Sequence, residues 1–193
     1  MSAVGIIFAN LHERNIPELT RIRAMASVPF GGRYRLIDFP LAYMVNAGIT
    51  DIRVITQAHY SSLMDHIGSG KDWDLARRSG GIKILPPNIN EQSGGVLVPA
   101  SRLESLKNIS VALDRIKSDY VVLSDCDVIC NPDIGKLLQR HAQAAQKSPC
   151  WSAARNFTGR CRIRPLWWIL TSRGGLPACR STRSMSRGSG TET

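Results

Sequence analysis

The pattern of apolar and polar positions over the first 147 residues alternates between short apolar runs and helical spacing. The apolar runs suit strands that are buried on both faces, as the strands of a parallel sheet are. They predict four strands: Ala3–Ala9, Asp51–Thr56, Gly81–Leu85 and Tyr120–Ser124. Apolar positions three and four residues apart predict three helices, His59–Ile67, Arg102–Lys117 and Asp133–Gln146. A fourth helix, from Asp38 to about Asn46, is predicted from Pro40 in its first turn and from the residues that flank it. Because strands and helices alternate, we expect an α/β domain with a mostly parallel sheet that helices cover on both faces.

Loop and turn residues separate the first predicted strand from the first predicted helix. The polar segment 10–26 shows no strand period, which predicts a long loop over one end of the sheet. Gly31 and Gly32 then predict a turn. Asp38 is placed to cap the helix that follows, and Gly48 is placed to end it.

The basic character of the chain is concentrated at its C-terminal end. The formal net charge of the whole chain is +10. Residues 1–147 hold 17 Lys and Arg against 14 Asp and Glu, a net of +3, whereas residues 148–193 hold 8 Arg against one acid, a net of +7. The basicity is therefore a property of the last segment, and we predict no nucleic-acid partner for the folded part.

Composition also separates residues 148–193 from the rest of the chain. This segment contains no Val, Asp, Lys or Tyr, yet it carries three of the four Trp and three of the five Cys. We therefore predict a domain over residues 1–147 and a separate tail over 148–193. Three interpretations of the tail stay open: an out-of-frame or misassembled reading frame, a disordered extension, and a functional basic arm.

Features that would place the protein in a membrane or an oxidising compartment are not found in the sequence. No apolar run reaches the roughly 18 residues of a membrane-spanning helix, and no basic segment precedes the first apolar run as in a signal peptide. We expect a cytoplasmic protein without a membrane partner. The five Cys lack C-x-x-C spacing and the four His form no ligand pattern, so we expect free thiols rather than a zinc site.

The segment Val28–Ile49 has a residue order that is characteristic of one enzyme family. It reads VPFGGRYRLIDFPLAYMVNAGI, and Gln57 closes the strand that follows it. The segment resembles the N-terminal region of glucose-1-phosphate adenylyltransferase (ADP-glucose pyrophosphorylase), and the resemblance extends over about residues 3–147. It implies a Rossmann-like nucleotidyltransferase domain. In that family a C-terminal left-handed β-helix domain follows and has no counterpart here, so the resemblance implies a truncated chain.

The resemblance also implies a reaction and its ligands. In this family, glucose 1-phosphate attacks ATP, which yields ADP-glucose for glycogen synthesis and releases pyrophosphate. A glycine-rich loop after the first strand lets the backbone approach the nucleotide phosphates, and carboxylates hold the metal. We therefore expect ATP, glucose 1-phosphate or a sugar-phosphate effector as ligands, with Mg²⁺ as the cofactor that the family uses.

Three positions depart from the pattern of this family where it handles phosphate or metal. Ala9 and Asn10 stand in place of the paired glycines, Met25 replaces a basic residue, and Cys126 stands where the family has its metal-binding Asp. In these departures the chain resembles the D-type subunit of the enzyme, which is poor at catalysis alone and modulates a catalytic partner in a mixed tetramer. The resemblance thus implies a regulatory subunit in a hetero-oligomer, inactive by itself.

Candidate residues for ligand and metal binding lie at the ends of the predicted strands. Ala9, Asn10 and Gln57 are candidates for nucleotide contact, because the carboxyl ends of parallel strands face the ligand crevice. Asp125 and Asp127 flank the departing cysteine and are candidate metal ligands. The alternative is that both acids are polar residues that satisfy backbone donors at a strand end.

Two arginines beside the predicted turn match basic positions that lie near the sugar-phosphate effector site of the family. Arg33 and Arg35 are therefore candidates for binding a phosphorylated effector, or else ordinary charges that flank a turn. Two further functions stay open for the chain as a whole. It could be an active sugar-phosphate nucleotidyltransferase that holds its metal with Asp125 and Asp127, or an inert fragment.

Overall fold

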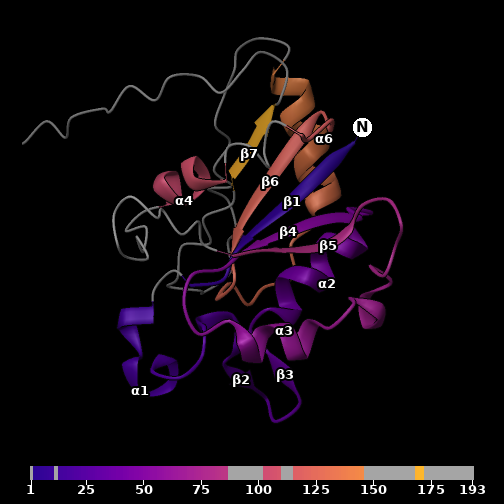
Figure 1. The fold of residues 1–193 in the computed structure, drawn as a ribbon. Coiled ribbons are helices and arrows are strands. Elements are labelled where there is room, and N and C mark those ends of the chain that lie inside the picture. Colours follow the sequence, from indigo (N-terminus) through magenta and orange to yellow (C-terminus); the bar gives the residue numbers. More distant parts are fainter. Residues whose placement is uncertain (1, 11–12, 87–101, 110–114, 146–167, 172–193) are drawn as a thin grey trace, which may run out of the picture.

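The structure is a computed structural model of the 193-residue chain, and it describes residues 2–10, 13–86, 102–109, 115–145 and 168–171. A twisted sheet runs through these residues, and helices pack on its two faces (Figure 1). None of the helices in these ranges has the length and apolar character needed to cross a lipid bilayer.

The central sheet has five strands in the order β5-β4-β1-β6-β7. Its members are β1 (Ala3–Phe8), β4 (Asp51–Ile55), β5 (Gly81–Leu85), β6 (Tyr120–Asp125) and β7 (Trp168–Thr171). The first four run parallel to their neighbours, and β7 pairs with β6 in the antiparallel direction. The α/β class and the mostly parallel sheet are confirmed, and all four strands predicted from apolar runs are present.

Strand β7 lies inside the segment that differs in composition from the rest of the chain. Its backbone pairs Leu170 with Val121 and Trp168 with Leu123 of β6. The sequence predicts no strand there. The pairing gives β6 a second neighbour, which satisfies backbone groups that an edge strand would leave open. The other residues of 148–193 lie outside the described part of the chain, and the proposed boundary after residue 147 stays a prediction.

Alternating residues of the strands divide the core into two clusters. On one face, Ile7, Ile52 and Val122 pack with α2 (Asp38–Asn46), α3 (Ser61–Ile67) and α6 (Ile134–Ala145). On the other face, Ile6 and Leu123 pack with Leu106 of α4 (Arg102–Asn108) and with Ile109. Figure 1 shows α4 across the sheet from the other three helices. Both faces are therefore covered, as the pattern of strands and helices predicts.

The segment between β1 and α2 is more ordered than the long loop that the sequence predicts. It contains the short helical turns η1 (Glu13–Asn15), α1 (Pro17–Thr20) and η2 (Met25–Ser27), followed by a hairpin of β2 (Pro29–Phe30) and β3 (Tyr34–Arg35). The Thr20 hydroxyl donates to the Glu13 and Ile16 carbonyls at 2.8 and 3.0 Å, which holds the first two turns together. The expectation of an irregular loop was wrong because such local bonds leave no apolar periodicity in the sequence.

The turn and the helix end predicted from glycines are both present. Gly31 and Gly32 form the turn of the hairpin with φ of +62° and +81°, angles that favour glycine. Gly48, at φ +77°, ends α2: its amide donates to Val45 at 2.8 Å, and the Ile49 amide donates to the Met44 carbonyl at 3.0 Å.

The other helix boundaries correct several predictions. Asp38 is the first residue of α2 rather than its cap, and its carboxylate accepts the Arg35 amide at 2.9 Å. Helix α3 starts at Ser61, because His59 has φ +53° and cannot continue a right-handed helix. Helix α4 ends at Asn108, residues 115–117 are not helical, and residues 110–114 lie outside the described part. A short turn, η3 (Lys71–Trp73), follows α3.

Candidate functional site

The candidate site lies where the carboxyl ends of β1, β4 and β6 meet. Phe8, the last residue of β1, is in register with Ile55 of β4 and Asp125 of β6. The residues that follow these three strands therefore emerge at one edge of the sheet. Open α/β sheets bind their ligands at this edge.

The end of β1 is joined to β4 by backbone hydrogen bonds of Ala9. Its amide donates to the Ile55 carbonyl at 2.9 Å, and its carbonyl accepts the Ala26 amide at 3.0 Å. Ala9 is fully buried in the larger core cluster, together with Met25. A phosphate-binding loop needs backbone amides that point at the ligand, whereas this amide extends the β1–β4 ladder. Met25, where the family has a basic residue, serves as core.

The Asn10 side chain bridges the ends of β1 and β4. Its Oδ1 accepts the Gln57 amide at 2.9 Å, and its Nδ2 donates to the Ala58 carbonyl at 3.0 Å and to the Glu13 carboxylate. Asn10 is only 6% exposed, and Gln57 is buried beside it. The structure thus brings the nucleotide candidates Ala9, Asn10 and Gln57 together, with the carboxamide of Asn10 holding the loops to each other.

At the end of β6, the side chains of Arg102 and Asp125 form an ion pair. Arg102, the first residue of α4, donates from Nε to Oδ1 of Asp125 at 2.9 Å and from Nη2 to Oδ2. Asp125 is 4% exposed. The hydrogen bond to Asp125, aided by the charges of Asp125 and Asp127, raises the pKa of Arg102 against the opposing effect of burial. A fork of two parallel bonds between a guanidinium and a buried carboxylate is a strong, geometrically specific contact.

The cysteine between the two acids is a buried neutral thiol. The Cys126 amide donates to the Phe8 carbonyl at 3.2 Å, and its Sγ donates to the Ala9 carbonyl at 3.5 Å. Burial first, and then the charges of Asp127 and Asp125, raise the pKa of this thiol well above its usual value. Metal coordination by cysteine requires the thiolate. Cys126 therefore replaces a metal-binding carboxylate with a group that is uncharged in the fold.

The side chains at the end of β6 do not fit the divalent metal that nucleotidyl transferases generally use. Both carboxylate oxygens of Asp125 accept from Arg102, and Cys126 is protonated. Among the described residues, no group of three or more His, Cys, Asp and Glu could hold a metal ion. Asp127 is half-buried and close enough to act on both Arg102 and Cys126 electrostatically. A metal role for Asp125 or Asp127 stays a prediction that this donor set does not support.

The two candidate effector residues take different positions on the β2–β3 hairpin. Arg33 is exposed in the turn. Arg35 is half-buried, and its Nη1 donates to the Ser62 carbonyl at 2.5 Å and to the Ser62 hydroxyl at 2.8 Å. Arg35 therefore ties the hairpin to the start of α3, while Arg33 stays accessible to a ligand in solution.

Two polar contacts, one buried and one partly buried, were missed by the sequence analysis. Asp38 of α2 pairs with Nε2 of His66 of α3 at 2.6 Å. The Tyr43 hydroxyl and the Ser124 hydroxyl lie 2.9 Å apart between α2 and β6, and burial raises the pKa of Tyr43 well above its usual range. The partners are 28 and 81 residues apart in sequence, so no local pattern could have identified them.

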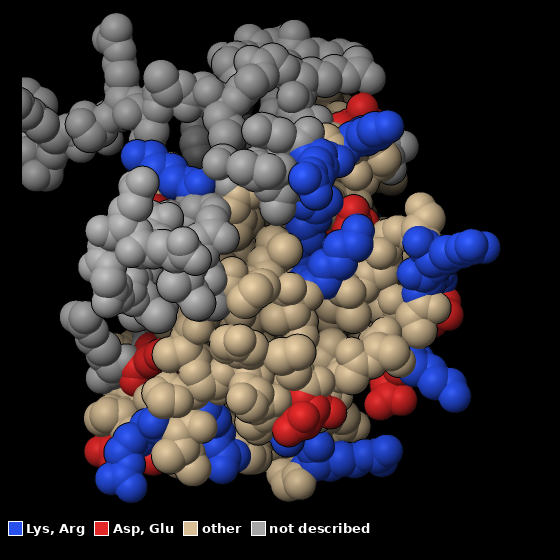
Figure 2. Space-filling view, in the orientation of Figure 1, with Lys and Arg blue, Asp and Glu red and all other residues tan. Residues whose placement is uncertain are grey.

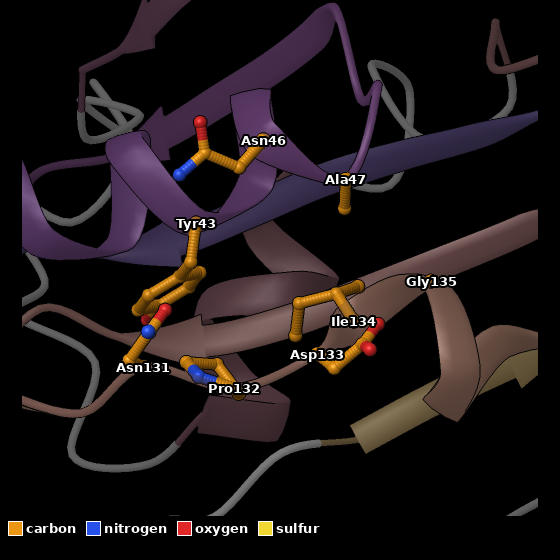
Figure 3. Close-up of a pocket in the computed structure, with 8 residues that line it drawn as sticks. All are labelled: Tyr43, Asn46, Ala47, Asn131, Pro132, Asp133, Ile134 and Gly135. Atoms are coloured by element: carbon orange, nitrogen blue, oxygen red, sulfur yellow. The ribbon is translucent and has the colours of Figure 1, made fainter.

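A separate cavity of about 440 Å³ lies between the C-terminal half of α2 and the chain that leads into α6. Figure 3 shows Tyr43 projecting from α2 toward Asn131 across this space. Asp133 borders it, but its carboxylate accepts the Lys136 amide at 2.9 Å and pairs with the Lys136 ammonium at 3.0 Å. The acid is thus used to cap α6.

Charged side chains of both signs are present on the face of the molecule that Figure 2 shows. In the face that Figure 2 shows, blue Lys and Arg and red Asp and Glu alternate around an uncharged centre. A nucleic-acid interface is expected to gather basic residues in a patch or stripe. The surface agrees with the small net charge of residues 1–147.

Comparison with known proteins identifies relatives in glycogen synthesis. The chain is 35% identical over 144 residues to "Glycogen biosynthesis protein GlgD" of Bacillus subtilis, covering 72% of this chain and 40% of that protein. It is 39% identical over 140 residues to "Glucose-1-phosphate adenylyltransferase" of Clostridium perfringens strain SM101, covering 72% and 36%. The chain therefore spans well under half the length of these relatives.

A solved structure and a family model agree with the fold. A crystal structure from Bacillus anthracis, assigned as a glucose-1-phosphate thymidylyltransferase, superposes with a TM-score of 0.57 at 18% identity, over 75% of this chain and 52% of that one. The model of the nucleotidyl transferase family matches residues 14–155. This match covers β4, β5, β6 and their helices, and the chain belongs to the nucleotidyl transferase family.

Proposed function

We propose that the chain acts in the formation of ADP-glucose for glycogen synthesis as a regulatory subunit that depends on a catalytic partner. Its relatives carry the names of both a glycogen biosynthesis protein and a glucose-1-phosphate adenylyltransferase. The expected ligands are ATP, glucose 1-phosphate or a sugar-phosphate effector, and the expected location is the cytoplasm. The partner would be the catalytic subunit of the same enzyme.

The observation that carries this proposal is the bridge made by Asn10 at the end of β1. Catalysis of nucleotidyl transfer needs donors that are aimed at the charge developing on the phosphates. Here the Ala9 amide bonds to Ile55, and the Asn10 carboxamide bonds to Gln57 and Ala58. Donors that are already paired inside the protein stabilise a transition state poorly, which favours a subunit that binds ligand or partner over one that catalyses.

An effector role for the β2–β3 hairpin is part of the same proposal. Arg33 is exposed in the turn, and the anchoring of Arg35 on Ser62 links that turn to the start of α3. A phosphorylated effector at Arg33 could thus act on the position of α3. The matched control is Arg78, an exposed arginine in the loop before β5.

The second candidate function is an active sugar-phosphate nucleotidyltransferase. It is favoured by the relatives named glucose-1-phosphate adenylyltransferase, whose sequence identities of 34–39% span the 35–36% of the relatives named GlgD. It differs from the main proposal in one measurable way, because it requires ADP-glucose to form without a partner.

The test is ADP-glucose formation by the full chain alone, by the catalytic subunit from the same organism alone, and by the two expressed together. We expect no product from the chain alone and a changed maximal rate or substrate affinity for the co-expressed pair. Replacing Arg33 with alanine should weaken the effector response of the pair, while Arg78→Ala should leave it unchanged. Product formation by the chain alone, at the rate of a catalytic subunit, would overturn the proposal in favour of the second candidate.

A further inference from the structure

The guanidinium of Arg102 supplies the positive charge next to the buried carboxylate of Asp125. It contacts both oxygens of Asp125, which is buried at the carboxyl end of β6. Removing a charge from water is costly unless an opposite charge and hydrogen bonds compensate for it. In a metal site the ion provides this compensation, and here the protein provides it from the first residue of α4.

The second acid of the segment acts on the same cation. The charge of Asp127 favours the protonated form of Arg102, as does the charge of Asp125. Cys126 lies between the two acids and is uncharged, whereas an Asp at its position would add a third carboxylate. Residues 125–127 therefore contain two acidic side chains. The single positive charge of Arg102 offsets one of these two negative charges, and a divalent ion bound at Asp125 would be repelled by the guanidinium that already contacts both of its oxygens.

We propose that Arg102 is an internal cation that replaces the divalent metal at the end of β6, so that Asp125 binds no metal ion in this protein. The proposal concerns only this charge site and does not depend on the regulatory role proposed above. A guanidinium has five N–H groups, of which Asp125 uses two. The Arg102 side chain is 29% exposed, so this edge of the sheet presents a fixed positive charge to a phosphorylated ligand whether or not divalent metal is present.

The experiment measures Mn²⁺ binding to the full chain by electron paramagnetic resonance and calorimetry at neutral pH. Mn²⁺ prefers the same oxygen ligands as Mg²⁺ and reports directly on bound and free ion. The variants are Arg102→Met, which removes the cation but keeps an unbranched stem, and Arg102→Gln, which keeps one donor for Asp125. Arg102→Lys is the matched control, because it keeps the charge. Each is also combined with Asp125→Asn.

In the wild-type chain and in Arg102→Lys, we expect Mn²⁺ binding to be the same with and without the additional substitution Asp125→Asn. Arg102→Met or Arg102→Gln should gain affinity for Mn²⁺ by at least about tenfold, a change of the size seen when the support of a metal ligand is altered. Asp125→Asn should abolish that gain. Mn²⁺ should also raise the melting temperature of Arg102→Met and leave that of the wild-type chain unchanged.

Two results would overturn the proposal. One is Mn²⁺ binding to the wild-type chain that disappears in the single variant Asp125→Asn, which needs no change at Arg102. The other is a folded Arg102→Met or Arg102→Gln variant, judged by circular dichroism, whose Mn²⁺ affinity equals that of the wild-type chain. If both Arg102 variants fail to fold, the comparison of Mn²⁺ binding by the wild-type chain and by Asp125→Asn still tests whether Asp125 binds a metal ion.

Discussion

The two halves of the candidate site are held together by different kinds of contact. At β1 and β4 the bridging group is an uncharged carboxamide, that of Asn10, which bonds to two backbone groups and donates to the Glu13 carboxylate. At β6 it is ionic, a guanidinium of Arg102 on the buried carboxylate of Asp125. Loss of the Asn10 carboxamide leaves a backbone amide and a backbone carbonyl unpaired. Loss of the Arg102 guanidinium leaves the charged carboxylate of Asp125 buried without a counter-charge. The same edge should therefore respond very differently to substitutions on its two sides.

The largest effect is expected from Arg102→Met, which leaves Asp125 without its cation. Loss of one partner of a buried pair destabilises by about 3–5 kcal/mol, and we expect the lower end because Arg102 is 29% exposed. Urea unfolding in metal-free buffer would measure it. The double variant Arg102→Met, Asp125→Asn should recover most of the loss, because no charge is then left unpaired. Equal stability of the single and double variants would contradict this account.

A smaller effect is expected from Asn10→Ala on the neutral side. The Gln57 amide and the Ala58 carbonyl lose their partner, and buried unpaired groups of this kind cost about 1–3 kcal/mol. The control is Asn15→Ala, at an exposed position, which should change the free energy of unfolding by less than about 0.5 kcal/mol. If Asn10→Ala destabilised as much as Arg102→Met, the distinction between the two sides would fail.

An internal reference for the loss of one buried hydroxyl is provided by Tyr43→Phe. The substitution removes the hydroxyl that lies 2.9 Å from the Ser124 hydroxyl and leaves the packing of the ring unchanged. We expect a loss of about 1 kcal/mol in unfolding by urea. Ser124→Ala should cost more, because it also removes the bond from the Ser124 hydroxyl to the Asp125 carbonyl at 2.9 Å, and the double variant should cost less than the sum of the two single losses.

The smallest effect concerns pH and a site away from the carboxyl ends of the strands. Burial lowers the pKa of His141 below its ordinary value of 6.5, and the ring packs edge-on against Tyr120 at 5.9 Å between centroids. As pH falls through 6.5 the unfolded chain takes up a proton more readily than the folded one, so this group reduces stability from there down to its folded pKa. His141→Phe should make the fall in melting temperature from pH 7 to pH 5 shallower. An unchanged slope would show that His141 does not contribute.

The elements of the fold could be predicted because their causes are local. An apolar run such as Ala3–Phe8 marks a buried strand, and Gly48 marks a helix end because its φ of +77° suits glycine. The contacts of the candidate site could not be predicted in the same way. Asn10 reaches Gln57 across 47 positions and Arg102 reaches Asp125 across 23, and nothing near either residue indicates its partner.

The sequence predicted the roles of single side chains less well than it predicted helices and strands. Asp38 looked like a helix cap, but its carboxylate also binds His66 of a different helix. Asp125 looked like a metal ligand because an acid at a strand end has that chemistry, yet Arg102 of α4 donates to both of its carboxylate oxygens. Residue type limits what a side chain can do, and only its partners determine what it does.

The central position of β1 has a consequence for the synthesis of the chain. This strand is made first, but its neighbour β6 begins at Tyr120, and Ala3 pairs with that residue. At roughly 5–20 residues per second, a ribosome needs about 6–23 s to add the 117 residues between such partners, as between Cys126 and Ala9. During that interval β1 lacks its β6 neighbour, and the unpaired edge can pair with a strand of another chain. The order of the strands in the sheet thus fixes a period of vulnerability before the fold exists.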